Sequence, residues 1–208
     1  MKTAEKTWIY GASGHGKVVL DCLSANNMIC YGFIDDDPSK TTIIGYPIQN
    51  YNAVDPSHDQ VVFGIGDNKT RKSLAEKLAF KYLKVVHPTA TISSYSTIGT
   101  GTVVFHQSVI QSGTSVGKHC IINTKASIDH DCNIGDYVHI SPGAILCGNV
   151  QVGELSWIGA GAVIIQGTKI GKNTIIGAGS VIIRDIPDNS VVVGNPGKII
   201  KTNDIPDF

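Results

Sequence analysis

Charged residues are scarce in this sequence, and neither sign of charge is in excess. Only 16% of the 208 residues are charged, with 17 basic and 17 acidic side chains. Proteins that bind nucleic acid or membrane surfaces normally carry a basic excess, and a coiled coil needs many more charges. No apolar run reaches the roughly 18 residues of a membrane-spanning helix. The composition therefore argues against all of these classes.

Closely spaced cysteine pairs and an apolar N-terminal segment are missing too. The five cysteines are odd in number and include no C-x-x-C pair, which argues against a disulfide framework and a cysteine zinc site. Residues 1–14 lack the apolar core of a signal peptide. We therefore expect a cytoplasmic protein without a membrane span.

The sequence does contain a six-residue repeat in its C-terminal half. An aliphatic residue recurs at every sixth position from Ile92 to Ile182, sixteen times without an insertion. In an α-helix, residues six apart point to opposite faces, and in a flat strand a spacing of two or four would serve as well as six. A spacing of six is expected for a coil with three flat sides, because one hexapeptide forms each side. We predict a parallel β-helix of about five coils whose aliphatic residues point inward.

The first third of the chain predicts a small α/β unit of the Rossmann type. A buried strand, 8–10, leads into the glycine-rich turn 11–17 and then into an apolar-periodic helix. The expected later elements are a strand at 31–34 that ends in Asp35-Asp36-Asp37, a strand at 61–65 that ends at Gly66, a helix from Thr70 to about Tyr82, and a strand near 84–86. Pro88 and the change of period after it place the boundary between two domains, 1–87 and 88–208. The short linker predicts that the two pack together.

Three interpretations compete for the glycine-rich turn. A phosphate-binding loop of an NTPase needs Ser or Thr after its Gly-Lys, whereas Val18 follows Lys17. A full dinucleotide site needs two such α/β halves, and only one fits here. A turn without a ligand is the third possibility. The acidic residues that end the next strand favour a nucleotide or a nucleotide-sugar, with its phosphates at the helix N-terminus.

His130 differs from the other six histidines in its neighbours. It stands between Asp129 and Asp131, two residues after an inward-pointing position, so its side chain is expected to point off the prism. A carboxylate that accepts from one imidazole nitrogen raises the basicity of the other. We predict that His130 is a general base, and the spacing leaves open which of the two acids orients it.

The repeat length also predicts what lies above His130. Residues one full coil apart stack on one face, and Gly148 is one coil after His130. The bare N–H of a glycine suits a thioester carbonyl oxygen, although a turn glycine is the simpler interpretation. Cys132 is near in sequence but two residues on, so it should point elsewhere and covalent catalysis is disfavoured.

Zinc bound by histidines between β-helices is a further alternative. His106, His119, His130 and His139 fall at different phases of the repeat or on different sides, and no pair is one coil apart. No metal site is predicted.

In combination, these motifs resemble the PglD and sialic acid O-acetyltransferase (NeuD-like) family of hexapeptide-repeat sugar acetyltransferases. The matching segments are IYGASGHGK (9–17), Asp35-Asp36, the hexapeptide run, NTKASIDHDCNIGDYVHISPGAILCGNVQVG (123–153) and VVVGNPGK (191–198). The resemblance implies a left-handed β-helix, a homotrimer with active sites between neighbouring prisms, and acetyl-CoA as the acyl donor. It makes residues 1–87 the nucleotide-sugar-binding domain and 88–208 the acetyltransferase domain.

The resemblance also implies roles for individual residues. His130 is the general base, Asp131 strengthens it, and Asn123 faces the acceptor. The residues implied to contact acetyl-CoA are His139, Gly148, Ala160, Ala178, Pro196 and Lys198. Those implied to hold the nucleotide-sugar are Ser13, Gly14, His15, Asp35, Asp36 and Gly66.

From the residues and the resemblance together, we predict an acetyl-CoA-dependent N-acetyltransferase. It would acetylate the amine of a UDP-4-amino-sugar of the bacillosamine type by direct attack, with His130 as the base. An O-acetyltransferase that acts on sialic acid or another sugar hydroxyl is the alternative. A sugar-nucleotide-binding scaffold without activity is disfavoured by the intact His130-Asp131 pair.

Overall fold

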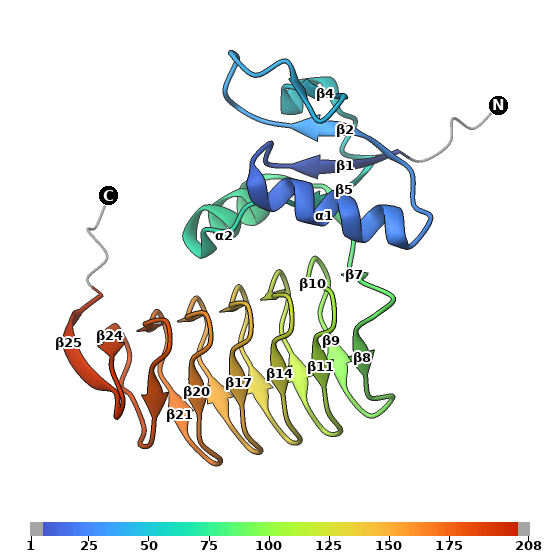
Figure 1. Ribbon diagram of the computed structural model, residues 1–208. Coiled ribbons are helices and arrows are strands. Elements are labelled where there is room, and N and C mark those ends of the chain that lie inside the picture. The colour runs from blue at the N-terminus through green and yellow to red at the C-terminus, as the bar shows by residue number, and fades with distance from the viewer. Residues whose placement is uncertain (1–5, 204–208) are drawn as a thin grey trace.

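The computed structural model describes residues 6–203 and consists of an α/β unit seated on a β-helix (Figure 1). The α/β unit contains β1 (Thr7–Tyr10), α1 (Gly14–Ala25), β2 (Cys30–Ile34), β3 (Thr42–Ile43), β4 (Tyr46–Gln49), a 3-10 turn (Tyr51–Ala53), β5 (Gln60–Phe63), α2 (Asn68–Lys77) and β6 (Lys81–Tyr82). Its sheet has the order β3-β4-β2-β1-β5-β6. All pairs in it are parallel except β3 with β4.

The central strand β1 is buried along its whole length because the sheet is covered on both faces. One face packs on α1, where Ile9 and Phe33 meet Val19 and Leu23. The same apolar cluster includes Phe105 of the β-helix. Helix α1 therefore lies between the sheet and the β-helix, which joins the two units through a shared core.

Helix α2 is shorter than the sequence suggested, and the expected end near Tyr82 was wrong. The helix ends at Lys77, and Leu78 is already extended (φ −106°, ψ 129°). Tyr82 instead lies in β6, paired with Val61 of β5, and its ring packs 5.0 Å from that of Phe63. Burial of this aromatic residue against the sheet outweighs the local helical pattern. The short strands β3 and β4 were not anticipated.

The C-terminal part is a three-sided β-helix of short parallel strands. These strands are β7 (Val85–Val86), β8 (Thr91–Ile92), β9 (Thr97–Ile98), β10 (Val103–Val104), β11 (Val109–Ile110), β12 (Ser115–Val116), β13 (Ile121–Ile122), β14 (Ser127–Ile128), β15 (Asn133–Ile134), β16 (His139–Ile140), β17 (Ile145–Leu146), β18 (Gln151–Val152), β19 (Trp157–Ile158), β20 (Val163–Ile164), β21 (Lys169–Ile170), β22 (Ile175–Ile176), β23 (Val181–Ile182), β24 (Ser190–Val193) and β25 (Lys198–Thr202). They form sheets of eight, six and five strands, one for each side of the prism. The repeat positions from Ile92 to Ile182 are the last residues of β8 to β23, so the predicted β-helix and its register are confirmed.

Most turns of the prism contain a residue with left-handed backbone. From Gly101 to Gly179 every sixth residue has a positive φ, including Asp131 (59°), Tyr137 (58°) and Leu155 (64°). Such a conformation costs a non-glycine residue on the order of 1 kcal/mol or more. The repeating coil geometry imposes this backbone conformation whatever the residue at the position.

Glycines that follow the inward residue allow the coils to stack. A Cβ on Gly135 would lie 2.7 Å from the backbone nitrogen of Glu154 in the next coil. A Cβ on Gly117 would meet the backbone of the coil above at 2.8 Å. A Cβ atom does not approach other atoms within 3 Å, so glycine at these positions lets the backbones approach.

The β-helix ends where the repeat changes. After β23, Ile186 bridges to Ile170, and β24 pairs with β22. The antiparallel strand β25 then pairs with β24. At the other end β7 already pairs with β10, so the β-helical sheets begin at Val85, and the division into domains at 87/88 stays a proposal. No helix within residues 6–203 has the length and apolar character needed to cross a bilayer.

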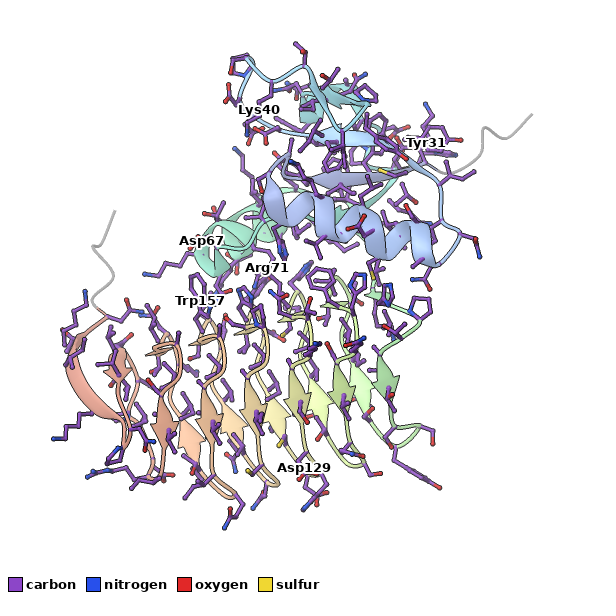
Figure 2. The ribbon with its side chains drawn as sticks, in the orientation of Figure 1. Tyr31, Lys40, Asp67, Arg71, Asp129 and Trp157 are labelled. Atoms are coloured by element: carbon purple, nitrogen blue, oxygen red, sulfur yellow. The ribbon has the colours of Figure 1, made fainter. Side chains whose placement is uncertain are left out.

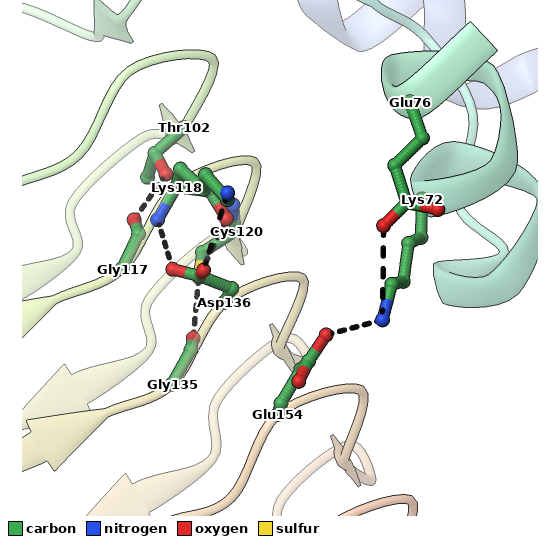
Figure 3. Close-up of polar contacts among 9 residues, drawn as sticks. All are labelled: Lys72, Glu76, Thr102, Gly117, Lys118, Cys120, Gly135, Asp136 and Glu154. Carbon is green, nitrogen blue, oxygen red and sulfur yellow. Dashed lines mark hydrogen bonds and ion pairs between the residues drawn. The ribbon is translucent and has the colours of Figure 1, made fainter.

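Helix α2 fixes the α/β unit on one edge of the prism, which confirms that the two units pack together. Asn68 donates from Nδ2 to the carbonyl of Leu155 (3.0 Å), and Arg71 donates to the carbonyls of His119 and Tyr137 (2.8 and 3.1 Å). At the surface, Lys72 pairs with Glu154 at 2.6 Å (Figure 3). The carbonyl groups that α2 contacts come from three successive coils.

Candidate active site

His130 lies on the exposed turn between β14 and β15. Its Nδ1 is 2.9 Å from Oδ2 of Asp131, and its backbone N–H donates to Oδ1 of Asp129 (2.8 Å). Asp131 is thus hydrogen bonded to the imidazole ring of His130, and Asp129 to its main chain. The hydrogen bond to Asp131 raises the pKa of His130, and the charge of Asp129 raises it further. When Asp131 accepts from Nδ1, the free Nε2 becomes the more basic atom that a general base needs.

Gly148 lies directly above the His130 ring. A Cβ at this glycine would be 2.6 Å from both Nε2 and Cε1 of His130. The 18-residue coil therefore stacks these two residues, as the strand register between β14 and β17 requires. The role of the Gly148 N–H toward a thioester stays a prediction.

Cys132 is not placed as a nucleophile. Its side chain is buried, and its Sγ contacts the carbonyl oxygens of Cys147 (3.2 Å) and His130 (3.7 Å). Burial raises the pKa of this thiol, which keeps it protonated and unreactive.

A second group of predicted residues gathers around His139 on β16. Nε2 of His139 is 3.1 Å from Nδ2 of Asn123, whose Oδ1 accepts from the N–H of Thr124. With the amide oriented in this way, Nδ2 donates and the imidazole proton is assigned to Nδ1. Burial, followed by the charge of Arg71, lowers the pKa of His139 to about 3. His139 is therefore a neutral ring at any ordinary pH.

Trp157 covers His139 from the next coil. The two rings are stacked, with centroids 5.2 Å apart and planes 11° apart, and the indole N–H donates to Oγ of Ser141 (2.7 Å). Sequence reasoning missed Trp157. The signal was available, since Trp157 pairs with His139 one coil later in the same sheet.

An apolar cavity of about 460 Å³ opens beside these two rings. It is lined by His139, Ser141, Pro142, Trp157, Gly159, Ala160, Ile175, Ile176, Gly177 and Ala178. The small residues on its floor leave room for a narrow, largely apolar chain such as the pantetheine arm of CoA. The predicted Ala160 and Ala178 are here, whereas Lys198 lines a separate cavity and Pro196 lines neither.

The N-terminus of α1 is the expected phosphate site. Ser13 occupies the N-cap position without a side-chain capping bond, and the first turn of this 12-residue helix holds no acid. Around Gly14 there is open space, since nothing lies within 4 Å of a Cβ built there. The first N–H groups of α1 are therefore not capped by the Ser13 side chain and favour an anion.

The two acidic residues after β2 have different surroundings. Asp35 accepts from the N–H of Ala12 (2.8 Å) and from Lys40 (2.9 Å), so its carboxylate supports the glycine-rich turn. Asp36 is exposed, and its two oxygens accept from the hydroxyl of Tyr10 (3.0 and 3.1 Å). Of the two, Asp36 is freer to meet a ligand.

His15 and Gly66 bring the α/β unit close to His139. The His15 ring is 5.4 Å from Phe105 and 6.3 Å from His139, measured between ring centroids. Burial, followed by the charge of Arg71, lowers the pKa of His15 to about 4. The loop at Gly66 is held by Arg71, a residue for which the sequence offered no signal.

The predicted residues thus form two groups on different edges of one prism. Figure 2 shows Trp157 on the side that faces the α/β unit and Asp129, next to His130, on the opposite side. The turn of His130 joins the six-stranded and five-stranded sheets, whereas α2 sits over the turns that join the five-stranded and eight-stranded sheets. One chain alone does not bring His130 to the nucleotide side. Among residues 6–203 no group of three His, Cys, Asp or Glu side chains is arranged to hold a metal.

Two family models match separate parts of the chain. Residues 6–78 match the PglD N-terminal domain, and residues 149–184 match the bacterial transferase hexapeptide (six repeats). These matches cover one segment of each structural unit described above.

Solved structures match nearly the whole chain. The acetyltransferase domain of PglB from Neisseria gonorrhoeae is 38% identical, covers 94% of this chain and 100% of its own, and superposes with a TM-score of 0.89; it has also been solved with acetyl coenzyme A. PerB from Caulobacter crescentus, solved with CoA and GDP-perosamine, is 35% identical over 96% of this chain and 99% of its own, with a TM-score of 0.90.

A curated relative matches a shorter segment. The UDP-N-acetylbacillosamine N-acetyltransferase of Bacillus subtilis is 38% identical over a 106-residue alignment, and the match covers 46% of this chain and 49% of that protein. The match therefore spans about half the length of the curated relative.

Proposed function

Because this chain belongs to the PglD-type family of hexapeptide-repeat sugar acetyltransferases, we propose that it transfers the acetyl group of acetyl-CoA to the amine of a nucleotide-linked amino sugar. The observation that carries this proposal is His130, held by Asp131 with Gly148 stacked on its ring. Relatives at 38% and 35% identity that were solved with acetyl coenzyme A or with CoA and GDP-perosamine support it.

In the proposed mechanism, His130 takes a proton from the sugar amine through Nε2 as the amine nitrogen attacks the thioester carbonyl. Asp131 stabilises the imidazolium that forms. The Gly148 N–H donates to the developing oxyanion. The carbon–sulfur bond then breaks, and the thiolate leaves as CoA.

We propose a UDP-4-amino-sugar as the acceptor, because the Bacillus subtilis relative is named for a UDP-linked sugar. The GDP-linked sugar bound by PerB makes the nucleotide a point to test. The Bacillus subtilis relative and the perosamine relative from Caulobacter crescentus are named N-acetyltransferases, which favours an amine over the alternative hydroxyl of sialic acid.

We further propose a homotrimer whose active sites lie between chains, in which His130 of one chain faces the His139 and nucleotide-binding groups of its neighbour. The separation of the two groups within one chain supports this arrangement. The five unpaired cysteines are compatible with a cytoplasmic location, which we also propose.

The test is thiol release from acetyl-CoA with a panel of acceptors. The panel holds UDP-, GDP- and dTDP-linked 4-amino sugars and free sialic acid, and wild type is compared with His130→Ala. The matched control is His106→Ala, because His106 has the same place in its hexapeptide as His130 but stacks on His87 and has no adjacent carboxylate.

We expect turnover with a nucleotide amino sugar, a loss on the order of a hundredfold or more in His130→Ala, and little change in His106→Ala. Turnover with sialic acid alone would replace the proposal by O-acetylation. Full turnover in His130→Ala would show that His130 is not the general base.

A further inference from the structure

Arg71 is an almost completely buried cation on α2. Its side chain is 1% exposed. A guanidinium has five N–H donors, and here all five have acceptors: His119, Tyr137, Ile65 and Gly66 through their carbonyls, and Asn68 through Oδ1, at 2.8 to 3.2 Å. None of these acceptors is a carboxylate. Burial of a charge is costly even with the charge of Asp67 nearby, so a simple surface-docking role does not account for this residue.

The acceptors of Arg71 belong to two parts of the molecule. Nη1 binds the carbonyls of Ile65 and Gly66, in the loop between β5 and α2. Nε and Nη2 bind the carbonyls of His119 and Tyr137, which have left-handed backbone (φ 53° and 58°) and sit one coil apart. One planar group therefore joins the loop to two coils of the β-helix.

The loop held by Arg71 is in direct contact with the glycine-rich turn. The N–H of Gly64 donates to the carbonyl of Tyr10 at 2.7 Å. A Cβ on Gly64 would lie 2.7 Å from Cα of Gly16 and 2.8 Å from the carbonyl oxygen of Gly11. Because the contact is this close, any displacement of the loop is transmitted to the turn that precedes α1.

Arg71 also lies near the two buried rings where the units meet. Its charge lowers the pKa of His15 and of His139, second only to burial in each case. Nε2 of His15 has no hydrogen-bond partner among the described residues. Burial and the charge of Arg71 keep both rings neutral.

We propose that Arg71 is a positioning residue for the nucleotide-sugar. It fixes the loop around Gly66, and through it the glycine-rich turn, at a set distance from His139 and the apolar cavity. This inference rests on the proposed function and adds a residue outside the expected substrate contacts. Loss of the hydrogen bonds of Arg71 should weaken binding of the nucleotide-sugar. Binding of acetyl-CoA should be unaffected, since no atom of Arg71 lines the apolar cavity.

The experiment compares Arg71→Lys with Lys72→Met. A lysine keeps the charge but has three donors on one nitrogen and cannot span both sets of carbonyls. Lys72, the next residue on α2, also crosses between the units through Glu154 but touches no carbonyl of the loop. The readouts are kcat and KM for each substrate, the thermal midpoint, and calorimetric titration with UDP, GDP and CoA.

For Arg71→Lys we expect the KM of the nucleotide-sugar to rise about tenfold, the equivalent of one or two net hydrogen bonds, with the KM of acetyl-CoA unchanged. Lys72→Met should match wild type in both. An unchanged KM of the nucleotide-sugar in a folded Arg71→Lys, or an equal rise in both KM values, would overturn the inference.

Two further arms keep the test decisive. If Arg71→Lys does not fold, Asn68→Ala removes one acceptor of Arg71 and should raise the same KM by about threefold; no rise there overturns the inference. If wild type turns over no nucleotide sugar, the proposed function fails, and the titrations decide the role of Arg71. Nucleotide binding that is tenfold weaker in Arg71→Lys then supports the positioning role, and equal binding or no binding to wild type refutes it.

Discussion

The imidazole of His130 and the carboxylate of Asp131 are hydrogen bonded although the two residues are adjacent in the chain, with 2.9 Å between Nδ1 and Oδ2. Asp131 has the left-handed backbone (φ 59°) that recurs at every sixth residue from Gly101 to Gly179. Asp129, which is equally close in sequence, accepts instead from the main-chain N–H of His130. The coil turn therefore sets which carboxylate acts on the base.

Replacement of Asp131 by Asn should move the acid limb of the pH–rate profile to lower pH. Asp131 raises the pKa of His130, and activity falls as pH drops through that pKa because the base becomes protonated. Without the carboxylate the pKa of His130 falls, so the acid limb moves to lower pH. The plateau rate drops by about tenfold because the base is weaker. The measurement is kcat/KM against pH. Asp129→Asn is the control and should shift the limb less; a limb that stays in place in Asp131→Asn contradicts the assignment.

Gly148→Ala should lower kcat on the order of a hundredfold, because a displaced base loses its alignment. The new Cβ would lie 2.6 Å from Nε2 of His130 and push the ring away. Steady-state kinetics and the thermal midpoint are measured together. Gly167→Asn is the matched control, because Gly167 lies on the same edge of the prism with nothing within 4 Å of its Cβ position. Its left-handed backbone is one that asparagine already adopts at Asn149, one coil earlier. Equal losses in the two variants would mean general destabilisation.

Trp157→Ala should raise the KM of acetyl-CoA by about tenfold and leave that of the nucleotide-sugar unchanged. The indole forms one wall of the apolar cavity and stacks on His139, and aromatic contact area of this kind contributes about 1 kcal/mol or more to binding. The two KM values are measured separately. Tyr95→Ala removes an aromatic ring that is 81% exposed elsewhere on the prism and should change neither. A rise in the nucleotide-sugar KM alone would assign the cavity to the other substrate.

Co-expression of His130→Ala with Asp36→Ala should restore activity that neither variant has alone. If each site takes His130 from one chain and the nucleotide group from its neighbour, random mixing in a cyclic trimer leaves about one quarter of the sites intact. Thiol release by the purified mixture is compared with that of each parent. A mixture as inactive as its parents would place both groups in one chain's site.

Gly135→Ala should destabilise the β-helix by about 3 kcal/mol or more, in the upper range for overpacked sites. Its Cβ would lie 2.7 Å from the backbone nitrogen of Glu154, and neither backbone can move without opening the coils. Denaturant unfolding measures the change in the free energy of unfolding. Gly179→Asn has open space and a left-handed φ of 67° that asparagine tolerates, so it should cost about 1 kcal/mol or less. Similar values for both would show that stacking distance is not the constraint.

The six-residue repeat was enough to predict the β-helix, the inward positions of its strands, and the stacking of Gly148 on His130. A coil of constant length converts spacing along the chain directly into position in space, so no long-range information is needed. The same rule would have found Trp157 above His139. Helical periodicity in the α/β unit was a poorer guide, because it extended α2 to Tyr82, which packs on Phe63 from β6 instead.

The edge of the prism that carries the α/β unit could not be predicted from local sequence. That choice depends on α1 packing on Phe105 and on Arg71 reaching the carbonyls of His119 and Tyr137, contacts between residues 48 or more apart in sequence. This position of the α/β unit separates His130 from His15 and His139. It also buries Arg71 between the two units, which no motif indicated. Local pattern cannot encode such contacts, because their energy comes from surfaces that exist only after both units have folded.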